Sequence, residues 1–501
     1  MLHKEEGPRL FDRVPWLSTS NSFLAEQYAQ IIRKTMARGE TCVILELGAS
    51  HGKFSFLVLQ HLMAQEDLPP FLYVISDVSR LNVEYCMHHP RLKTFVEQGI
   101  VDFAVFDALS DQNITLIRSG TVLSSCARLV VISNYLFSCL PHDAFRCVPL
   151  KDRTDVYESL VVCRSTQSKE IDKYDPELLS RIVLSWSYRL VSQKTLESYY
   201  TGKYAALSKI LTPAISAYAS LGACSFTVPV GAVNCLDRLQ RIARGNLVLL
   251  CADKGYLTPE ELLGLRDPHI AVHSSFSCMV NLDLIAKYWK SKWSGTTLHT
   301  RYSNGLKVAL FGPSNILGAS CVELFHSGIG KFGPEETFSF QKLIKEEIPN
   351  PSLKLIMSLL RLTCFDSDVF LKYKDDLLQH TSQKLSLKVV NDLICDLEQV
   401  CKFQYQVSPQ KNVLLEVGSI AFALQRHEFA STLAQQVLES KTSPQVRSRA
   451  LLLLANCDNE QGNIESAKQH VSSALLADPN SSEAKALLIQ LDQRTLEDFK
   501  A

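Results

Sequence analysis

The chain lacks an excess of charge of one sign and lacks a long apolar run. Lysine and arginine number 52, and aspartate and glutamate also number 52, so no overall field favours nucleic acid or an anionic membrane. No apolar stretch approaches the ~20 residues that span a bilayer. The opening MLHKEEGPRLFDRV contains no apolar signal core, and its acids argue against a transit peptide. We therefore expect a cytoplasmic protein with no membrane span and no nucleic-acid partner.

Closely spaced cysteine pairs are also lacking. The chain has 15 cysteines, an odd number, and none forms a C-x-x-C pair. Structural zinc needs four convergent ligands, usually in tight pairs. We therefore expect no metal site and expect reduced, mostly buried thiols.

Alternation of apolar runs with stretches of helical period predicts the fold class of the first part. Continuous apolar strands separated by helices are typical of a parallel sheet covered on both faces, which is a doubly wound α/β domain. Further strands are expected at 155–163, 224–231 and 246–256, and a hairpin at 295–302 and 305–312. The first four expected strands are 42–47, 71–76, 101–106 and 128–133.

The remaining patterns divide the chain into domains within its 501 residues. A helix is expected before Gly39, and a helical insertion is expected to lie over the carboxyl edge of the sheet. The last 170 residues show little strand signal. The expected parts are a lead and helix over 1–40, the α/β domain over 41–333 with its helical insertion at 173–221, a helical connector over 334–410, and repeats over 411–501.

Small residues recur in the last part with a spacing that indicates tetratricopeptide-like repeats. In LLLLANCDNEQGNIESAKQHVSSALLADPN they fall where such a unit packs two helices closely. Ala421 precedes Ala455 by 34 residues, and Ala434 precedes Ala467 by 33. A last helix at 482–499 could cap the stack. The alternative is two unrelated amphipathic hairpins; the repeat interpretation predicts a protein partner.

The stretch VILELGASHGKF carries the best candidate for a cofactor turn. A sharp turn after a strand needs glycine, and a cofactor against the backbone tolerates no side chain there. A dinucleotide fold would use G-x-G-x-x-G, but here Ser50 takes the middle position and Lys53 the third. An acid, Glu46, lies two residues before Gly48, and Gly52 follows. This spacing matches the turn of class I S-adenosylmethionine (SAM) methyltransferases and predicts SAM as the cofactor.

Polar residues also follow the next three expected strands. Asp77 could accept both ribose hydroxyls, Asp107 could bond the adenine amino group, and Asn134 would lie near the reactive methyl group. Such residues at successive strand ends define the crevice where open sheets bind ligands. Each also has a structural alternative: Asp77 as a helix cap, Asp107 as a turn residue, and Glu46 as a paired structural acid.

These motifs resemble those of the MidA-like family of SAM-dependent methyltransferases. That family pairs an ELGPGRG-type turn with E-V-S and N-E-x-x-D-A-L-P-x-x-x-F; this chain has ELGASHG, DVS and NYLFSCLPHDAF. The resemblance covers 43–145 and extends more faintly to about 320, through LLCADKGY and HIAVHSSFSCMVN. It implies a Rossmann-like class I methyltransferase sheet. The implied cofactor-binding residues are Glu46, Gly48, Ala49, Ser50, Gly52, Asp77, Val78, Asp107, Ala108 and Asn134.

The chain departs from the family pattern where the acceptor would bind. The family's Glu and Asp are replaced by Tyr135 and Ser138, so the carboxylates that position a guanidinium are missing. An amide, hydroxyl or carboxyl acceptor therefore stays open, with Asn134 and Tyr135 as the catalytic candidates. Possible bases that we do not assign are His51, His142 and His273.

Two functions follow from these observations. The first is a SAM-dependent methyltransferase acting on an acceptor, expected to be a protein side chain, with repeats that recruit a partner. The second is a catalytically degenerate methyltransferase fold that serves as a binding scaffold. A nicotinamide oxidoreductase is disfavoured by Lys53. The acceptor, the partner and the oligomeric state stay open.

Overall fold

The computed structural model describes residues 19–498, apart from 171, 173, 174, 176, 273, 274, 302–304 and 409. Residues 1–18 of the lead and helix expected over 1–40, the candidate base His273 and most of the expected hairpin turn lie outside this part. The described chain forms two compact units. The larger includes Leu24–Phe338, and the smaller joins Asn21–Phe23 to the residues from Ser339 onward.

The larger unit is built on an eight-stranded sheet with the order β15-β16-β11-β6-β1-β2-β3, in which β14 also pairs with β11. Strands β1, β2, β3, β6 and β11 are parallel, whereas β16 is antiparallel to both β11 and β15. This order, with its inverted last strand, is that of a class I methyltransferase sheet and confirms the expected fold class. The strands are β1 Cys42–Leu47, β2 Phe71–Asp77, β3 Val101–Val105, β6 Arg128–Asn134, β11 Leu247–Tyr256, β14 Val280–Asn281, β15 Thr296–His299 and β16 Leu306–Gly312.

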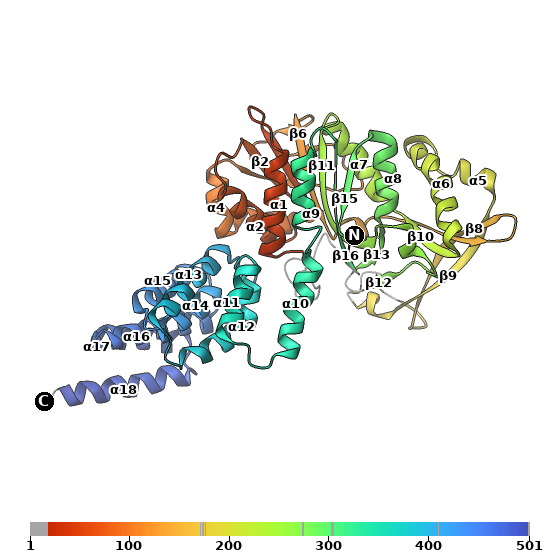
Figure 1. The fold of residues 1–501 in the computed structure, drawn as a ribbon. Helices are drawn as coiled ribbons and strands as arrows, with labels where there is room; N and C mark the ends of the chain where they lie inside the picture. The colour runs from red at the N-terminus through yellow and green to blue at the C-terminus, as the bar shows by residue number, and fades with distance from the viewer. Residues whose placement is uncertain are drawn as a thin grey trace. The chain divides into compact units, whose positions relative to one another are not determined.

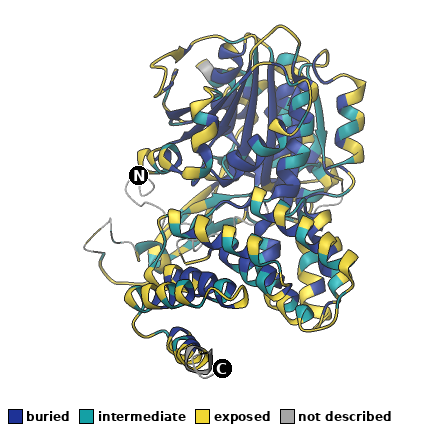
Figure 2. Ribbon diagram, turned by 90° about the vertical axis from the view of Figure 1, so that its left-hand side faces the viewer, coloured by how far each residue is buried: buried dark blue, intermediate teal, exposed yellow. Residues whose placement is uncertain are grey.

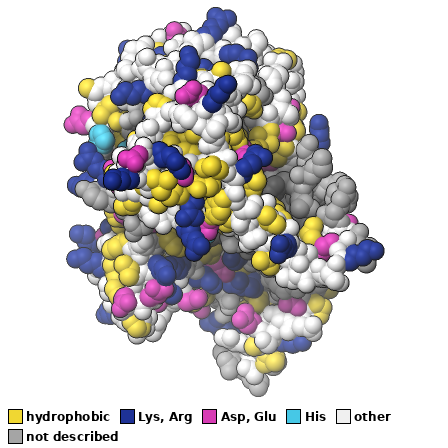
Figure 3. All heavy atoms as spheres, turned by 90° about the vertical axis from the view of Figure 1, so that its right-hand side faces the viewer, with side chains coloured by type: hydrophobic (Ala, Val, Ile, Leu, Met, Phe, Trp, Pro, Cys, Tyr) yellow, Lys and Arg dark blue, Asp and Glu magenta, His cyan; other side chains and the backbone are white. Residues whose placement is uncertain are grey.

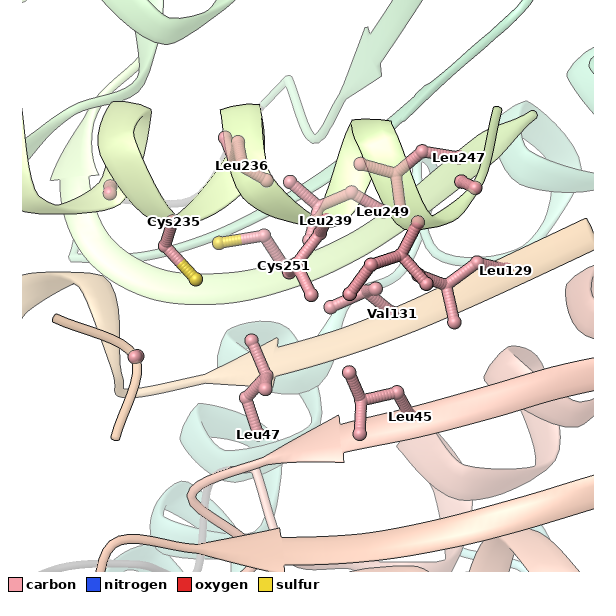
Figure 4. Packing of buried hydrophobic residues seen from close by; sticks show 14 of the residues in the cluster. Leu45, Leu47, Leu129, Val131, Cys235, Leu236, Leu239, Leu247, Leu249 and Cys251 are labelled. Atoms are coloured by element: carbon pink, nitrogen blue, oxygen red, sulfur yellow. The ribbon is translucent and has the colours of Figure 1, made fainter. Parts of the chain in front are cut away.

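Helices cover both faces of this sheet (Figure 1), which explains why every residue of β1 is buried. One face packs against α7, where Leu239 lies over Leu45, Val131 and Leu249 (Figure 4). The central strands are accordingly the most buried part of the unit (Figure 2). Its helices are α1 Ser22–Thr35, α2 Lys53–Met63, α3 Arg80–His88, α4 Pro90–Glu97, α7 Val230–Ile242, α8 Leu282–Trp293 and α9 Ala319–Ser327.

The expectation of an all-helical insertion over 173–221 is wrong. Residues Ile182–Val191 form strand β9, the edge of a second, antiparallel sheet with the order β10-β7-β8-β9. The stretch LSWSYRL alternates apolar and polar residues, a period of two that indicates a strand. Among the described residues of the insertion, α-helices occur only after β9. These elements are β7 Asp143–Pro149, β8 Thr154–Ser165, β10 Cys224–Val228, η5 Leu178–Arg181, α5 Gln193–Glu197, η6 Gly202–Tyr204 and α6 Ala205–Leu221.

The second sheet joins the main sheet near the carboxyl end of β11. There β14 pairs with Gly255 and Tyr256, and Thr227 Oγ1 of β10 donates to Met279 O at 2.9 Å. Hydrophobic side chains gather among Lys and Arg on the side of the molecule shown in Figure 3. On β8 and β9 the exposed apolar side chains include Leu160, Val183 and Leu190. Short elements of this unit are η4 Phe137–Cys139, η7 Pro259–Leu262, β4 Ile114–Thr115, β5 Val122–Leu123, β12 Ile270–Val272 and β13 Phe276–Cys278.

The smaller unit is helical, and its last helices form a repeated hairpin. The helix α10 Pro334–Glu347 leads into it from the larger unit. No helix in the described part of the chain is long and apolar enough to cross a membrane. The helices are α11 Leu353–Leu362, α12 Ser367–Thr381, α13 Leu387–Phe403, α14 Val413–Ala423, α15 His427–Glu439, α16 Pro444–Glu460, α17 Ile464–Ala477 and α18 Ser482–Asp498.

The small residues of the repeat are buried, but their register differs from the expected one. The bond from Ala430 N to Arg426 O in one hairpin recurs from Ala467 N to Asn463 O in the next, an offset of 37 residues. Gly418 is therefore equivalent to Ala455. The expected pairings, Ala421 with Ala455 and Ala434 with Ala467, are wrong because α16, with 17 residues, is longer than α14, with 11 residues.

Candidate cofactor and acceptor site

Strand register brings three of the predicted residues into one row. Leu47 of β1 aligns with Ser76 of β2 and with Ser133 of β6. The residue after each of these is Gly48, Asp77 and Asn134, respectively. The order of strands reverses between β1 and β6, and such a reversal opens a crevice at the carboxyl ends. The candidate site therefore lies at the topological switch point.

The turn after β1 has a left-handed backbone at alternate positions. The φ angles are 67° at Gly48, 58° at Ser50 and 77° at Gly52. Ser50 is not a glycine, so this conformation costs about 1 kcal/mol there. Its N–H donates to Asp77 Oδ2 at 2.9 Å, and the buried Ala49 donates its N–H to Ser76 O at 2.9 Å. The turn is thus tied to the end of β2.

Glu46 lies in a buried hydrogen-bond network beneath this turn. Its Oε2 accepts from Ser55 Oγ at 2.5 Å and from Tyr73 Oη at 2.6 Å. Burial raises the pKa of this carboxyl to about 7, against the opposing effect of the two hydroxyl donors. The contacts of Oε2 are therefore those of a structural acid paired inside the protein, the alternative role given above for Glu46.

The carboxylates expected to bind the nucleoside are engaged by their own backbone turns. Asp77 Oδ1 accepts from Ser79 N at 2.8 Å, while Ser79, not Asp77, caps α3. Asp107 Oδ1 accepts from Leu109 N at 2.8 Å, as in a turn. Directly after these acids, Val78 is half-buried and Ala108 is buried.

Asn134 ends β6 with one satisfied and one unsatisfied amide atom. Its Oδ1 accepts from Tyr28 Oη at 3.1 Å and from Ala252 N at 3.2 Å. Its Nδ2 is buried and has no hydrogen-bond partner. An orphaned buried donor costs about 1–3 kcal/mol. Tyr28 comes from α1, so the N-terminal helix reaches the switch point, which its sequence period alone did not indicate.

Tyr135 follows Asn134 in an unusual conformation. Its φ is 50°, in the left-handed region that bulky side chains rarely adopt, and its N–H donates to Ala252 O at 2.8 Å. Leu136 packs next, with its Cδ1 3.4 Å from the place a Cβ would occupy on Gly48. Backbone strain of this kind clusters at functional sites. The two catalytic candidates therefore lie beside the glycine turn.

Sequence reasoning missed an acid at this place. Asp253 of β11 is fully buried, and its Oδ2 accepts from Ser138 N at 3.0 Å. Burial raises its pKa to about 6. The position that lacks the family's Asp thus meets a carboxylate from another strand. The stretch LLCADKGY contained this signal, a single acid at the end of a buried strand.

The candidate bases lie in different surroundings. His142 bonds Phe137 O through Nε2 at 3.0 Å, and because a carbonyl only accepts, Nε2 carries the proton. Its Nδ1 is buried without a partner, and burial lowers the pKa of the ring to about 4. His51 is buried in the turn, where Nδ1 accepts from Lys53 N at 3.2 Å. No group of three or more His, Cys, Asp or Glu within the described ranges is placed to hold a metal ion.

Comparison with known proteins gives one family match. The family model "Tetratricopeptide repeat" matches residues 421–491, which confirms the repeat expected there. A search of curated proteins returns no significant match.

Two solved structures from Burkholderia thailandensis show a distant likeness. One, a candidate methyl transferase bound to S-adenosyl-homocysteine, is 13% identical with a TM-score of 0.40, covering 65% of this chain and 85% of that chain. The other, a native structure of an uncharacterized protein of the same superfamily, is 12% identical with a TM-score of 0.39, covering 64% and 87%. Likeness at these TM-scores carries no argument for function.

Proposed function

We propose that this chain is a cytoplasmic SAM-dependent methyltransferase of the MidA-like kind, acting on a protein side chain. The observation that carries the proposal is the row formed by Gly48, Asp77 and Asn134 at the switch point of a class I sheet. The acceptor is taken to be an amide, hydroxyl or carboxyl group. The repeats over 421–491 would recruit the protein partner.

The turn and the strand ends fit the cofactor in two respects. Left-handed Gly48 and Gly52 leave the backbone of the turn without side chains. The unpartnered Nδ2 of Asn134 offers a donor beside it. When bound, SAM supplies an electrophilic methyl group, so the protein mainly has to position the acceptor. Residues proposed to hold SAM are Glu46, Gly48, Ala49, Ser50, Gly52, Asp77, Val78, Asp107, Ala108 and Asn134.

The acceptor side would be formed by the segment that follows β6. Asn134 and Tyr135 would orient the acceptor's lone pair toward the methyl group. Asp253 is the positioning residue in this proposal, since its carboxylate holds the N–H of Ser138 and thereby fixes the turn that carries Tyr135. Asp253 does not reach solvent, so a direct role for it as a base is not part of the proposal.

A binding scaffold is the second candidate. It is favoured by the carboxylates of Asp77 and Asp107, which already accept hydrogen bonds from their own turns. If those bonds persist in solution, fewer lone pairs are free for a nucleoside. The two candidates differ in one measurable property, the binding of SAM.

Titration calorimetry with S-adenosylhomocysteine tests the cofactor. We expect submillimolar binding that Gly52→Arg abolishes, because the side chain would fill the turn. Gly99→Arg is the matched control: Gly99 also has a positive φ, 74°, but nothing lies within 4 Å of its Cβ position. Both variants carry the same backbone strain. Absence of binding in the unmodified chain would leave the scaffold.

The acceptor can then be found with methyl-labelled SAM and cell lysate. A single labelled protein, lost with Gly52→Arg and kept with Gly99→Arg, is the expected result. If the cofactor binds but no protein in the lysate becomes labelled, methyl transfer to a protein is contradicted.

A further inference from the structure

Arg238 of α7 is a buried cation without a carboxylate partner. Its side chain is 3% exposed. Nη1 donates to Leu109 O at 3.1 Å and Nη2 to Ala108 O, whereas Nε is buried and has no partner. Among the described residues, none of its nitrogens lies in an ion pair with Asp or Glu. Arginine is almost never fully buried unless it is paired, because removing its charge from water costs several kcal/mol.

A cavity adjoins this guanidinium. It has a volume of about 420 Å³ and lies between α7 and the end of α8. This volume is within the range of small-molecule sites, roughly 300–1,000 Å³. The lining is mostly polar. It consists of Gln112, Asn234, Asp237, Arg238, Gln240, Arg241, Lys292 and Trp293.

The charges of this lining do not balance. Lys292 is neutralised by Asp237, which its Nζ contacts at 2.6 Å. Arg238 and Arg241 have no such partner in the described part of the chain, so two positive charges remain. A ligand that neutralised the cavity would therefore carry two negative charges.

We propose that this cavity binds a small organic phosphate monoester. A phosphate monoester carries nearly two negative charges at neutral pH, since its second pKa is about 6. Guanidinium groups match its oxygens through paired N–H donors. The phosphate contacts Arg238 and Arg241, and the volume of the cavity leaves room for the organic part of the ligand. A monocarboxylate would leave one of the two positive charges unmatched.

The site is joined to the candidate cofactor site through one side chain. Arg238 donates to the carbonyls of Ala108 and Leu109, in the loop that follows β3. A phosphate bound to the same guanidinium would change the hydrogen bonds that Arg238 donates to that loop. Binding of the phosphate itself, however, does not depend on the proposed methyl transfer.

Calorimetry on the full chain tests the site, with glycerol 3-phosphate as the probe and acetate and chloride as references at equal ionic strength. We expect saturable binding of glycerol 3-phosphate alone. Arg241→Gln should weaken it about tenfold, the effect of losing ~1.4 kcal/mol. Arg241 is exposed, so the variant should fold, which circular dichroism would verify.

Lys290→Gln is the matched control, because Lys290 is an exposed cation of α8 outside the lining. Its affinity should stay within about twofold of the unmodified chain. Equal binding of acetate, or an unchanged affinity in Arg241→Gln, would overturn the assignment. Since no cofactor is present in these titrations, failure here is distinct from failure of the methyltransferase proposal.

Discussion

The carboxylate of Asp253 in β11 accepts the backbone N–H of Ser138 in η4, the turn that follows β6, at 3.0 Å. The two residues are 115 positions apart in the chain. The carboxylate next to Ser138 is therefore supplied by β11 and not by the segment that follows β6. This contact links the end of β11 to the turn that carries Tyr135.

Replacing that acid with an amide should loosen the turn. In Asp253→Asn an acceptor oxygen is exchanged for an N–H₂ donor, so one of the backbone N–H groups that Asp253 accepts loses its partner. We expect a loss of about 1–3 kcal/mol in the free energy of unfolding. Urea unfolding followed by tryptophan fluorescence measures this in the larger unit, because all four tryptophans precede Ser339. Asp152→Asn, at an exposed acid, should change nothing, and equal stability of both variants would contradict the role of Asp253.

Glu46 should make the larger unit less stable as the pH rises. Its pKa is about 7 in the folded chain and 4.5 in the reference state, so the folded state holds the extra proton between these values. Stability therefore falls with rising pH across that window, by up to ~1.4 kcal/mol per unit, and levels off above 7. The stability difference between the wild type and Glu46→Gln should follow this curve.

The comparison with the variant is needed because other buried groups titrate nearby. Asp253, with a pKa of about 6, gives a slope of the same sign at lower pH. His142, with its pKa lowered to about 4, gives the opposite slope below 6.5. Between pH 6.5 and 7 the stability difference between the wild type and Glu46→Gln therefore reports the titration of Glu46. Glu84→Gln, at an exposed acid, is the control for the loss of one carboxyl group.

Asn134 should contribute to cofactor affinity through its unpartnered amide donor. Asn134→Leu keeps the number of heavy atoms but removes Nδ2 together with Oδ1, and we expect about tenfold weaker binding of S-adenosylhomocysteine. Tyr28→Phe is the matched variant, because it removes only the bond from Tyr28 to Asn134 Oδ1. Its affinity should stay within about threefold. Equal losses in both variants would assign the effect to the Tyr28 contact instead of the donor.

Gly418 should be intolerant of a larger side chain. A Cβ there would lie 2.8 Å from Leu453 Cδ2, so α14 and α16 pack closely only because the residue is glycine. Gly418→Val should cost about 1–3 kcal/mol and raise hydrogen exchange in both helices. Thr432→Val, on the exposed side of α15, introduces the same side chain without a clash. Exchange that is unchanged in Gly418→Val would contradict the 37-residue register, in which Gly418 is the counterpart of Ala455.

The sequence determined the main sheet and the position of its crevice. Apolar runs such as 42–47 have to be buried on both faces, and parallel strands place their carboxyl ends at one edge. The turn from Gly48 to Gly52 was also predictable from the sequence, because a left-handed backbone favours glycine. Strand β9 is also readable from LSWSYRL, whose period of two indicates a strand and not the helix predicted there.

Only the tertiary structure decided the contacts between distant segments. Asp253 beside Ser138, Tyr28 beside Asn134 and Arg238 beneath Ala108 each join residues from separate elements. Local periodicity reports which face of an element is buried, but not which partner it meets. Whether a buried polar group is satisfied depends on that partner, and it is the unsatisfied groups, Asn134 Nδ2 and Arg238 Nε, that mark the two sites proposed for this protein.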